Sequence, residues 1–339
     1  MAVIRDTMAE FDLFQPASID DALALKRRYG KTSWALAGGL DSLDWFKDRI
    51  KRPEVVIDLS AVESMRGIRE TDDAGADGVE IGAMTTLTEV AEHAGILSRF
   101  GLLADAASKV ATPQIRNQGT IGGNVTQDTR CWYYRGGWPC YRAGGNICYA
   151  DTPTAINREH ALFESNRCVA VNPSDTAPAL IALDAKFVIL GGGGEKVVDA
   201  EDYFITPAKD ITRMTILEPG ELLTSIRIPG TWAGARFYFE KVRDRQAWDF
   251  PLVNIASAMK VSGNTIEDIR LVVNAVGPRP LRLTDVERQL KGQSVTEEVG
   301  QAAGELALLG ARPLQHNAYK IPLMRNLVRR AIRGTGARV

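Results

Sequence analysis

The sequence predicts an α+β protein in which short strands alternate with helices and then give way to an antiparallel sheet. Apolar runs of strand length recur between amphipathic helical segments as far as Pro229-Gly230, which marks a boundary. Beyond that boundary three strand-like runs follow one another before the chain turns helical again. A chain of 339 residues is long enough for two or three domains, so we expect about three subdomains.

The first part of the chain carries clear signals for helix ends. Ser18 precedes two acidic residues, as at a helix N-terminus, and Gly30 ends the apolar spacing, so a helix is expected between them. Thr86 and Glu89 form a capping box that starts a further helix. Strands are expected at 33–37, 54–59 and 79–83, a helix at 102–110, and a loop at 111–124.

The second half reads as a helix followed mainly by hairpins. A helix is expected at 176–183, and the four glycines at 191–194 read as a hairpin turn rather than a phosphate loop. The predicted strands lie at 186–190, 195–198, 222–228, 237–242, 255–261 and 269–276, the last three forming an antiparallel sheet before the C-terminal helices.

Composition excludes several function classes. A formal net charge of −1 gives no electrostatic reason to expect nucleic-acid binding. No apolar run approaches the roughly 20 residues of a membrane span, and the N-terminus lacks the apolar core of a signal peptide. We therefore expect a cytoplasmic protein, with a periplasmic location only through co-export on a partner's signal.

Two loops contain paired glycines, which let backbone N–H groups approach an anion closely. They are Ala37-Gly38-Gly39-Leu40-Asp41-Ser42 and Thr120-Ile121-Gly122-Gly123-Asn124. Together they could hold one diphosphate from two sides. Neither loop matches a dinucleotide fingerprint or a Walker A motif, and each alone is equally compatible with a tight turn.

All four cysteines lie between Cys131 and Cys168, with the spacing C-x8-C-x7-C-x19-C through Cys140 and Cys148. Four thiolates suit a [4Fe–4S] cluster or a tetrahedral zinc ion, although zinc sites usually contain closely spaced pairs. Two disulfides are the third possibility. Five arginines against three acids, and six tyrosine or tryptophan residues, accompany the cysteines and could offset a cluster's charge and exclude water.

The order of motifs resembles one known family. A-G-G-x-x-S, T-x-x-Q-I-R-N-x-G-T-I-G-G-N, N-P-S-D and K-V-R-x-R follow one another as in the FAD-binding subunit of molybdenum hydroxylases, the relatives of xanthine dehydrogenase. The cysteine-rich insert resembles the [4Fe–4S] loop of the 4-hydroxybenzoyl-CoA reductase flavin subunit and of bacterial aldehyde oxidoreductase flavin subunits. The run Asp128-Thr129-Arg130-Cys131 resembles the aldehyde type more closely.

This resemblance implies a two-part FAD-binding domain of the PCMH type, followed by a C-terminal three-stranded antiparallel sheet with helices. The implied domains are residues 1–62 and 63–230 for the two FAD-binding subdomains, with the insert at about 125–170, and residues 231–339 for the C-terminal domain.

The resemblance also implies which residues hold the cofactors. No catalytic residue is expected, because the carbon chemistry would take place on molybdenum in another subunit. A cation at Lys241 would stabilise reduced flavin. The residues implied for FAD are Ala37, Gly38, Gly39, Leu40, Asp41, Ser42, Thr112, Thr120, Ile121, Gly122, Gly123, Asn124, Asp175, Leu223 and Lys241, and those implied for the [4Fe–4S] cluster are Cys131, Cys140, Cys148 and Cys168.

The implied function is an electron-transfer oxidoreductase subunit. Its partners would be a large molybdopterin-binding subunit, a small subunit with two [2Fe–2S] clusters and an external electron acceptor, in an assembly of heterotrimers. A subunit like that of 4-hydroxybenzoyl-CoA reductase or of an N-heterocycle dehydrogenase is an alternative, as is a self-contained flavin oxidase. The sequence leaves the organic substrate, the acceptor and the direction of electron flow open.

Overall fold

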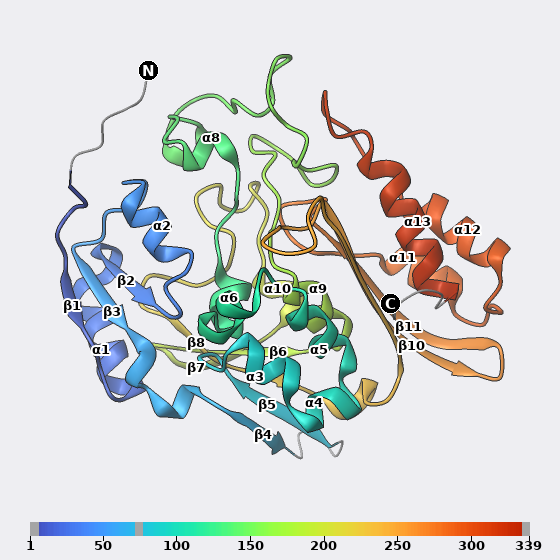
Figure 1. Cartoon of the computed structure of the whole chain (residues 1–339), viewed down its shortest axis with the longest axis horizontal. Coiled ribbons are helices and arrows are strands. Elements are labelled where there is room, and N and C mark those ends of the chain that lie inside the picture. Colours follow the sequence, from blue (N-terminus) through green and yellow to red (C-terminus); the bar gives the residue numbers. More distant parts are fainter. Residues whose placement is uncertain (1–6, 72–76, 334–339) are drawn as a thin grey trace.

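The computed structural model describes residues 7–71 and 77–333 and confirms the α+β class (Figure 1). The N-terminal unit is a parallel sheet of order β1-β3-β2, with helix α1 connecting its outer strands. Ser18 caps α1 as predicted, and its hydroxyl accepts from the Asp21 N–H at 3.1 Å. The elements are β1 (Asp12–Phe14), α1 (Ile19–Tyr29), β2 (Ser33–Leu36), α2 (Ser42–Lys47) and β3 (Val55–Asp58).

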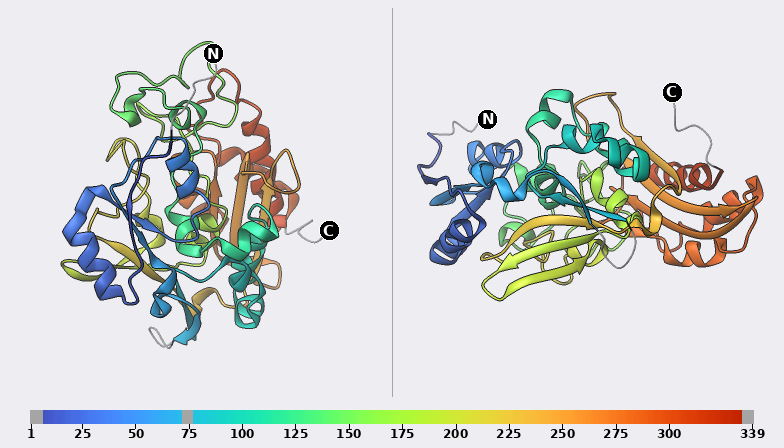
Figure 2. Two further views of the ribbon diagram at one scale, coloured as in Figure 1. Left: turned by 60° about the vertical axis from the view of Figure 1, so that its left-hand side comes forward. Right: turned by 90° about the horizontal axis from the view of Figure 1, so that it is seen from below.

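The central unit is an antiparallel sheet of order β4-β5-β8-β6-β7 with helices packed against it. Figure 2 shows these helices on one face of the sheet. The four-glycine run is the turn between β6 and β7, as predicted. The elements are β4 (Ile68–Thr71), β5 (Gly78–Gly82), α3 (Leu87–Glu92), α4 (Ala94–Arg99), α5 (Gly101–Ser108), α6 (Pro113–Gln118), α7 (Ile121–Thr126), α9 (Thr176–Ala182), β6 (Lys186–Gly191), β7 (Gly194–Asp199), α10 (Ala200–Tyr203) and β8 (Leu222–Ile228).

Residues 111–124 are not the continuous loop that the sequence suggested. Two short helices, α6 and α7, occupy most of this stretch. Each begins at a threonine whose hydroxyl accepts a backbone N–H three residues later: Thr112 from Ile115 and Thr120 from Gly123. A helix of six residues is too short to show the helical period of apolar residues in the sequence. Only the capping threonines could have predicted these two helices.

The C-terminal unit is a four-stranded antiparallel sheet of order β12-β11-β10-β9, one two-residue strand more than predicted. Its own apolar core includes Met324, Leu327 and Val328 of α13, which packs on the sheet. The elements are β9 (Arg236–Val242), β10 (Val253–Ser262), β11 (Thr265–Asn274), β12 (Leu281–Arg282), α11 (Thr284–Leu290), α12 (Glu297–Leu306) and α13 (Lys320–Arg333).

The cysteine-rich insert leaves α7 and crosses the top of the molecule in Figure 1 before the chain returns at α9. Its only α-helix among the described residues is α8 (Trp132–Arg135). A small apolar cluster joins Tyr134 and Cys140 of the insert to Trp45 and Phe46 of α2. Across the described ranges, no helix is both long and apolar enough to cross a membrane.

Candidate functional site

A cleft of about 500 Å³ lies where the two glycine loops meet. Its volume lies in the usual range for cofactor sites. Both glycine loops contribute to its lining, together with the residues that follow α5, the loop before β8 and the loop between β9 and β10. Residues 43–119 separate the two glycine loops in the sequence, and the fold brings the loops to one site.

Gly38 of the first loop touches the backbone immediately before the second loop. A Cβ atom there would lie 2.3 Å from the Gln118 carbonyl oxygen and 3.1 Å from the Gly119 Cα atom. Gly39 has a φ of +77°, a left-handed conformation that favours glycine. The first glycine pair therefore serves both a close backbone contact and a turn.

Asp41 of the first loop is neutralised by the insert. Arg130 Nη1 and Arg135 Nη2 each donate to its Oδ1 at 2.6 Å, and Trp45 Nε1 donates to Oδ2 at 3.0 Å. Two guanidinium groups thus compensate the negative charge of this carboxylate, which lies in a loop expected to hold a diphosphate. The insert is tied to the glycine loop by the same contacts.

Lys26 is a cleft residue that the sequence reasoning missed. It lies on the inward face of α1 with Ala22 and Leu23 and is 7% exposed. Its ammonium donates a long hydrogen bond, 3.5 Å, to the Ser33 carbonyl oxygen. Burial lowers its pKa from 10.5 to about 8. A lysine at an inward position of an amphipathic helix is the signal that could have identified it.

This depressed pKa gives a testable effect on stability. A lysine whose pKa is lower in the folded state costs stability below that pKa, and the cost disappears as pH rises from about 8 to 10.5. Lys26→Met should therefore stabilise the FAD-free chain at pH 7 by on the order of 1–3 kcal/mol. Urea unfolding at pH 7 and pH 10 measures this, and a wild-type stability that does not rise across this range relative to the variant contradicts it.

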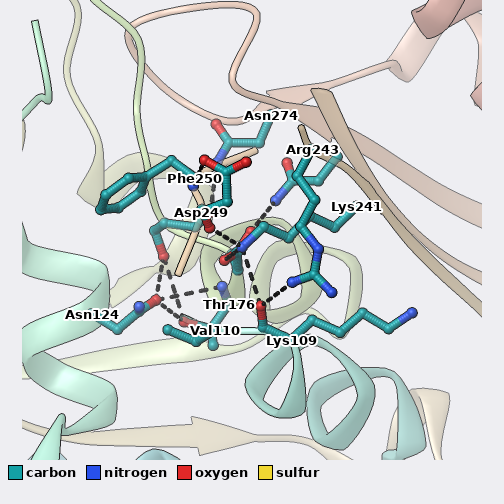
Figure 3. Close-up of polar contacts among 12 residues, drawn as sticks. Lys109, Val110, Asn124, Thr176, Lys241, Arg243, Asp249, Phe250 and Asn274 are labelled. Carbon is teal, nitrogen blue, oxygen red and sulfur yellow. Dashed lines mark hydrogen bonds and ion pairs between the residues drawn. The ribbon is translucent and has the colours of Figure 1, made fainter. Parts of the chain in front are cut away.

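The second glycine loop is fixed by packing and by Asn124. A Cβ atom at Gly122 would lie 2.7 Å from the Ala83 carbonyl oxygen. Asn124 Oδ1 accepts from the Ser174 and Thr176 hydroxyls, both at 2.7 Å, so the loop is joined to the start of α9 (Figure 3).

Asp175 and Lys241 form a fully buried ion pair behind the cleft. Lys241 Nζ donates to Asp175 Oδ2 at 2.5 Å and to the Lys109 and Asp249 carbonyl oxygens at 3.1 and 2.8 Å (Figure 3). Asn254 Nδ2 donates to the other Asp175 oxygen. Burial raises the pKa of Asp175, while the Lys241 ammonium opposes that rise. The pair holds α5, α9 and the loop after β9 together.

The sequence-predicted FAD residues therefore fall into two groups. Those that line the cleft are Ala37, Gly38, Gly39, Leu40, Asp41, Ser42, Thr120, Gly123, Asn124 and Asp175. Those placed outside its lining are Thr112, Ile121, Gly122, Leu223 and Lys241. Leu223 belongs to the apolar core, and Lys241 reaches the cleft through Asp175 and Asp249.

Two aromatic side chains in the loop after β9 also line the cleft. Trp248 is 62% exposed with a φ of +54°, and Phe250 is 40% exposed. The Arg130 guanidinium lies 4.5 Å from the centre of the Phe250 ring. Both aromatic side chains therefore present apolar surface to the cleft.

The four cysteines surround one small cavity in the insert. Cys131, Cys140, Cys148 and Cys168 all line it, with Tyr133, Tyr134, Arg142 and Tyr149 among the other lining residues. All four are free thiols, which argues against the disulfide alternative. Within the described residues no group of cysteines, histidines or carboxylates has the geometry for a single metal ion.

Burial makes these thiols hard to ionise without a cation. It raises the pKa of Cys131 to about 12 and also raises the pKa of Cys148 and Cys168. Most of the insert's arginines form ion pairs with carboxylates rather than facing the cysteines. Arg130 and Arg135 pair with Asp41, and Arg158 pairs with Asp244. Arg142 alone among them lines the cavity, where it also binds Asp128. The arginine count therefore overstates the positive charge at the cysteines.

Comparison with known proteins agrees with this geometry. The family described as "FAD binding domain in molybdopterin dehydrogenase" matches residues 9–231, and "CO dehydrogenase flavoprotein C-terminal domain" matches residues 237–335. The carbon monoxide dehydrogenase medium chain of Hydrogenophaga pseudoflava is 31% identical over 97% of this chain and 98% of its own length. The aldehyde oxidoreductase FAD-binding subunit PaoB of Escherichia coli (strain K12) is 31% identical over 85% of this chain and 86% of its own length.

A solved structure shares the whole fold. Carbon monoxide dehydrogenase from Hydrogenophaga pseudoflava superposes with a TM-score of 0.76 at 29% identity, covering 96% of this chain and 97% of the other. The matched regions, the two converging glycine loops and the antiparallel C-terminal sheet lead to one assignment. The chain belongs to the family of FAD-binding medium subunits of molybdenum hydroxylases.

Proposed function

We propose that this chain binds FAD in the cleft between its glycine loops and transfers electrons within a molybdenum hydroxylase complex. The convergence of the two loops on one cleft is the observation that carries the proposal. Gly38, Gly39, Gly123 and Asn124 would face the diphosphate, and Trp248 and Phe250 would cover the flavin ring. Bound FAD would supply the ability to take up electrons singly and release them in pairs.

The chain's own residues would prepare the site in three ways. Arg130 and Arg135 neutralise Asp41 and so reduce its repulsion of a diphosphate. Lys26 offers a buried positive charge, and no acidic partner lies at hydrogen-bond distance among residues 7–71 and 77–333. Lys241 and Asp175 fix the loop that carries Trp248 and Phe250, because Lys241 also donates to the Asp249 carbonyl oxygen.

We propose partners by analogy with the named relatives. A large molybdopterin-binding subunit would oxidise the organic substrate, and a small subunit with two [2Fe–2S] clusters would pass electrons to this chain. An external acceptor would then receive them. The aldehyde-type motif at residues 128–131 favours an aldehyde oxidoreductase-like complex over a reductase of 4-hydroxybenzoyl-CoA type. We also propose domains at 1–62, 63–230 and 231–339, and the family matches to residues 9–231 and 237–335 support the second of these two boundaries.

We further propose that the four cysteines of the insert bind a [4Fe–4S] cluster. Their arrangement around one cavity and their free thiols support it. The insert borders the FAD cleft, since Arg130 lines the cleft and Cys131 lines the cavity.

The test is cofactor analysis of the anaerobically purified complex. We expect about one FAD per chain and four irons with acid-labile sulfide beyond the small subunit's complement, with a fast-relaxing low-temperature EPR signal after reduction. Cys148→Ser should lose that iron and signal but keep FAD. Zinc, or no additional iron, in the wild type would overturn the cluster, and absence of flavin would overturn the FAD assignment.

A further inference from the structure

The insert contains one buried histidine that contacts a cysteine of the cavity. His160 is 3% exposed, and its Nε2 lies 3.3 Å from Cys131 Sγ. Its Nδ1 is buried, with no hydrogen-bond partner within the part of the chain that the structure describes. The ring therefore makes a single polar side-chain contact, and that contact is with sulfur.

A segment from the C-terminal unit holds this histidine in place. Asn317, which is fully buried, donates from Nδ2 to the carbonyl oxygens of His160 and Ala161 at 3.0 and 3.1 Å. Lys320, also fully buried, donates to the Glu159 carbonyl oxygen at 3.0 Å and to that of Ala275 at 2.7 Å. The backbone on both sides of the imidazole is thus fastened to a different domain.

The chemistry of the sulfur decides which way the hydrogen bond runs. A cysteine that binds iron does so as a thiolate, which has no proton and can only accept. His160 must then carry its proton on Nε2 and donate it to Sγ. This tautomer also leaves Nδ1 unprotonated, so Nδ1 is a hydrogen-bond acceptor. A buried acceptor without a partner costs less free energy than a buried N–H group without one.

We infer that His160 is a positioning residue that raises the reduction potential of a cluster bound at Cys131, and that Asn317 and Lys320 hold it in donating position. This inference rests on the proposed cluster. A hydrogen bond to a ligand sulfur withdraws negative charge from it, and reduction adds negative charge, so the bond stabilises the reduced form more than the oxidised form. Loss of the donor should therefore shift the potential to more negative values.

A matched pair of variants separates the hydrogen bond from packing. His160→Met fills the site without a donor, whereas His160→Gln keeps an N–H group near the position of Nε2. The reduction potential is measured by an EPR-monitored redox titration of the whole complex. We expect His160→Met to lower the ratio of reduced to oxidised cluster about tenfold at a given solution potential, which corresponds to a potential about 59 mV more negative for one electron. The reduction potential of the His160→Gln complex should stay near that of the wild type.

The possible outcomes are distinct. Wild-type potential in an iron-replete His160→Met complex overturns the inference, as does an equal shift in both variants. Absence of the additional iron from the wild type overturns the cluster proposal itself, and with it this role. If His160→Met fails to assemble, pulsed EPR of the wild-type complex labelled with ¹⁵N-histidine decides: a weak nitrogen coupling on the fast-relaxing signal supports the contact, and its absence overturns it.

Discussion

Gly38→Ala is expected to lower the affinity for FAD at least 100-fold, and the purified complex should contain little flavin. The added Cβ would lie 2.3 Å from the Gln118 carbonyl oxygen and 3.1 Å from the Gly119 Cα atom. Both neighbours are backbone atoms, so the first glycine loop would have to move away from the backbone that leads into the second. A hundredfold loss corresponds to about 2.8 kcal/mol, within the usual cost of overpacking a tight contact. Flavin content and fluorescence titration of the FAD-free chain with FAD measure the effect.

Gly192→Ala is the matched control. Gly192 lies in the turn between β6 and β7, where an added Cβ would meet no heavy atom within 4 Å. The same chemical change there should leave flavin content and affinity as in the wild type. Stoichiometric FAD of unchanged affinity in Gly38→Ala would contradict the proposal that contact between the two loops shapes the cofactor site.

Lys241→Met is expected to destabilise the chain by about 3–5 kcal/mol, the usual cost of removing one partner from a buried ion pair. The Asp175 carboxylate would be left buried with Asn254 as its remaining side-chain donor, and the loop at Asp249 would lose its attachment to α9. Urea unfolding of the purified FAD-free chain measures this loss. Lys291→Met, which removes an exposed pair with Asp268, should cost less than about 1 kcal/mol.

The Lys241→Met effect should depend on pH in a defined direction. Burial already raises the pKa of Asp175, and loss of the ammonium raises it further. A carboxyl whose pKa is higher in the folded than in the unfolded chain loses stability as pH rises through that folded value. The variant should therefore be closer to the wild type at pH 5 than at pH 8. A deficit that is equal at both values, or one below 1 kcal/mol, would contradict a buried charge as its cause.

Elements with several local signals were predictable from the sequence. Ser18 and the capping box at Thr86 mark helix starts that the structure confirms, and the glycines at 191–194 form the predicted turn. The short elements β1, α2, α6 and α7 were missed. Three to six residues are too few to show a hydrophobic period, and tertiary contacts decide their conformation.

The sequence by itself determined the fold class, the glycine pairs and the clustering of the cysteines, because backbone freedom and ligand type are properties of single residues. Only the tertiary structure decided which side chains face the cleft. Lys241 is bound to Asp175 behind it, Lys26 reaches it from α1, and Arg130 neutralises Asp41. These pairings join residues far apart in the chain, and the burial that lowers the pKa of Lys26 and raises that of Asp175 exists only in the folded chain.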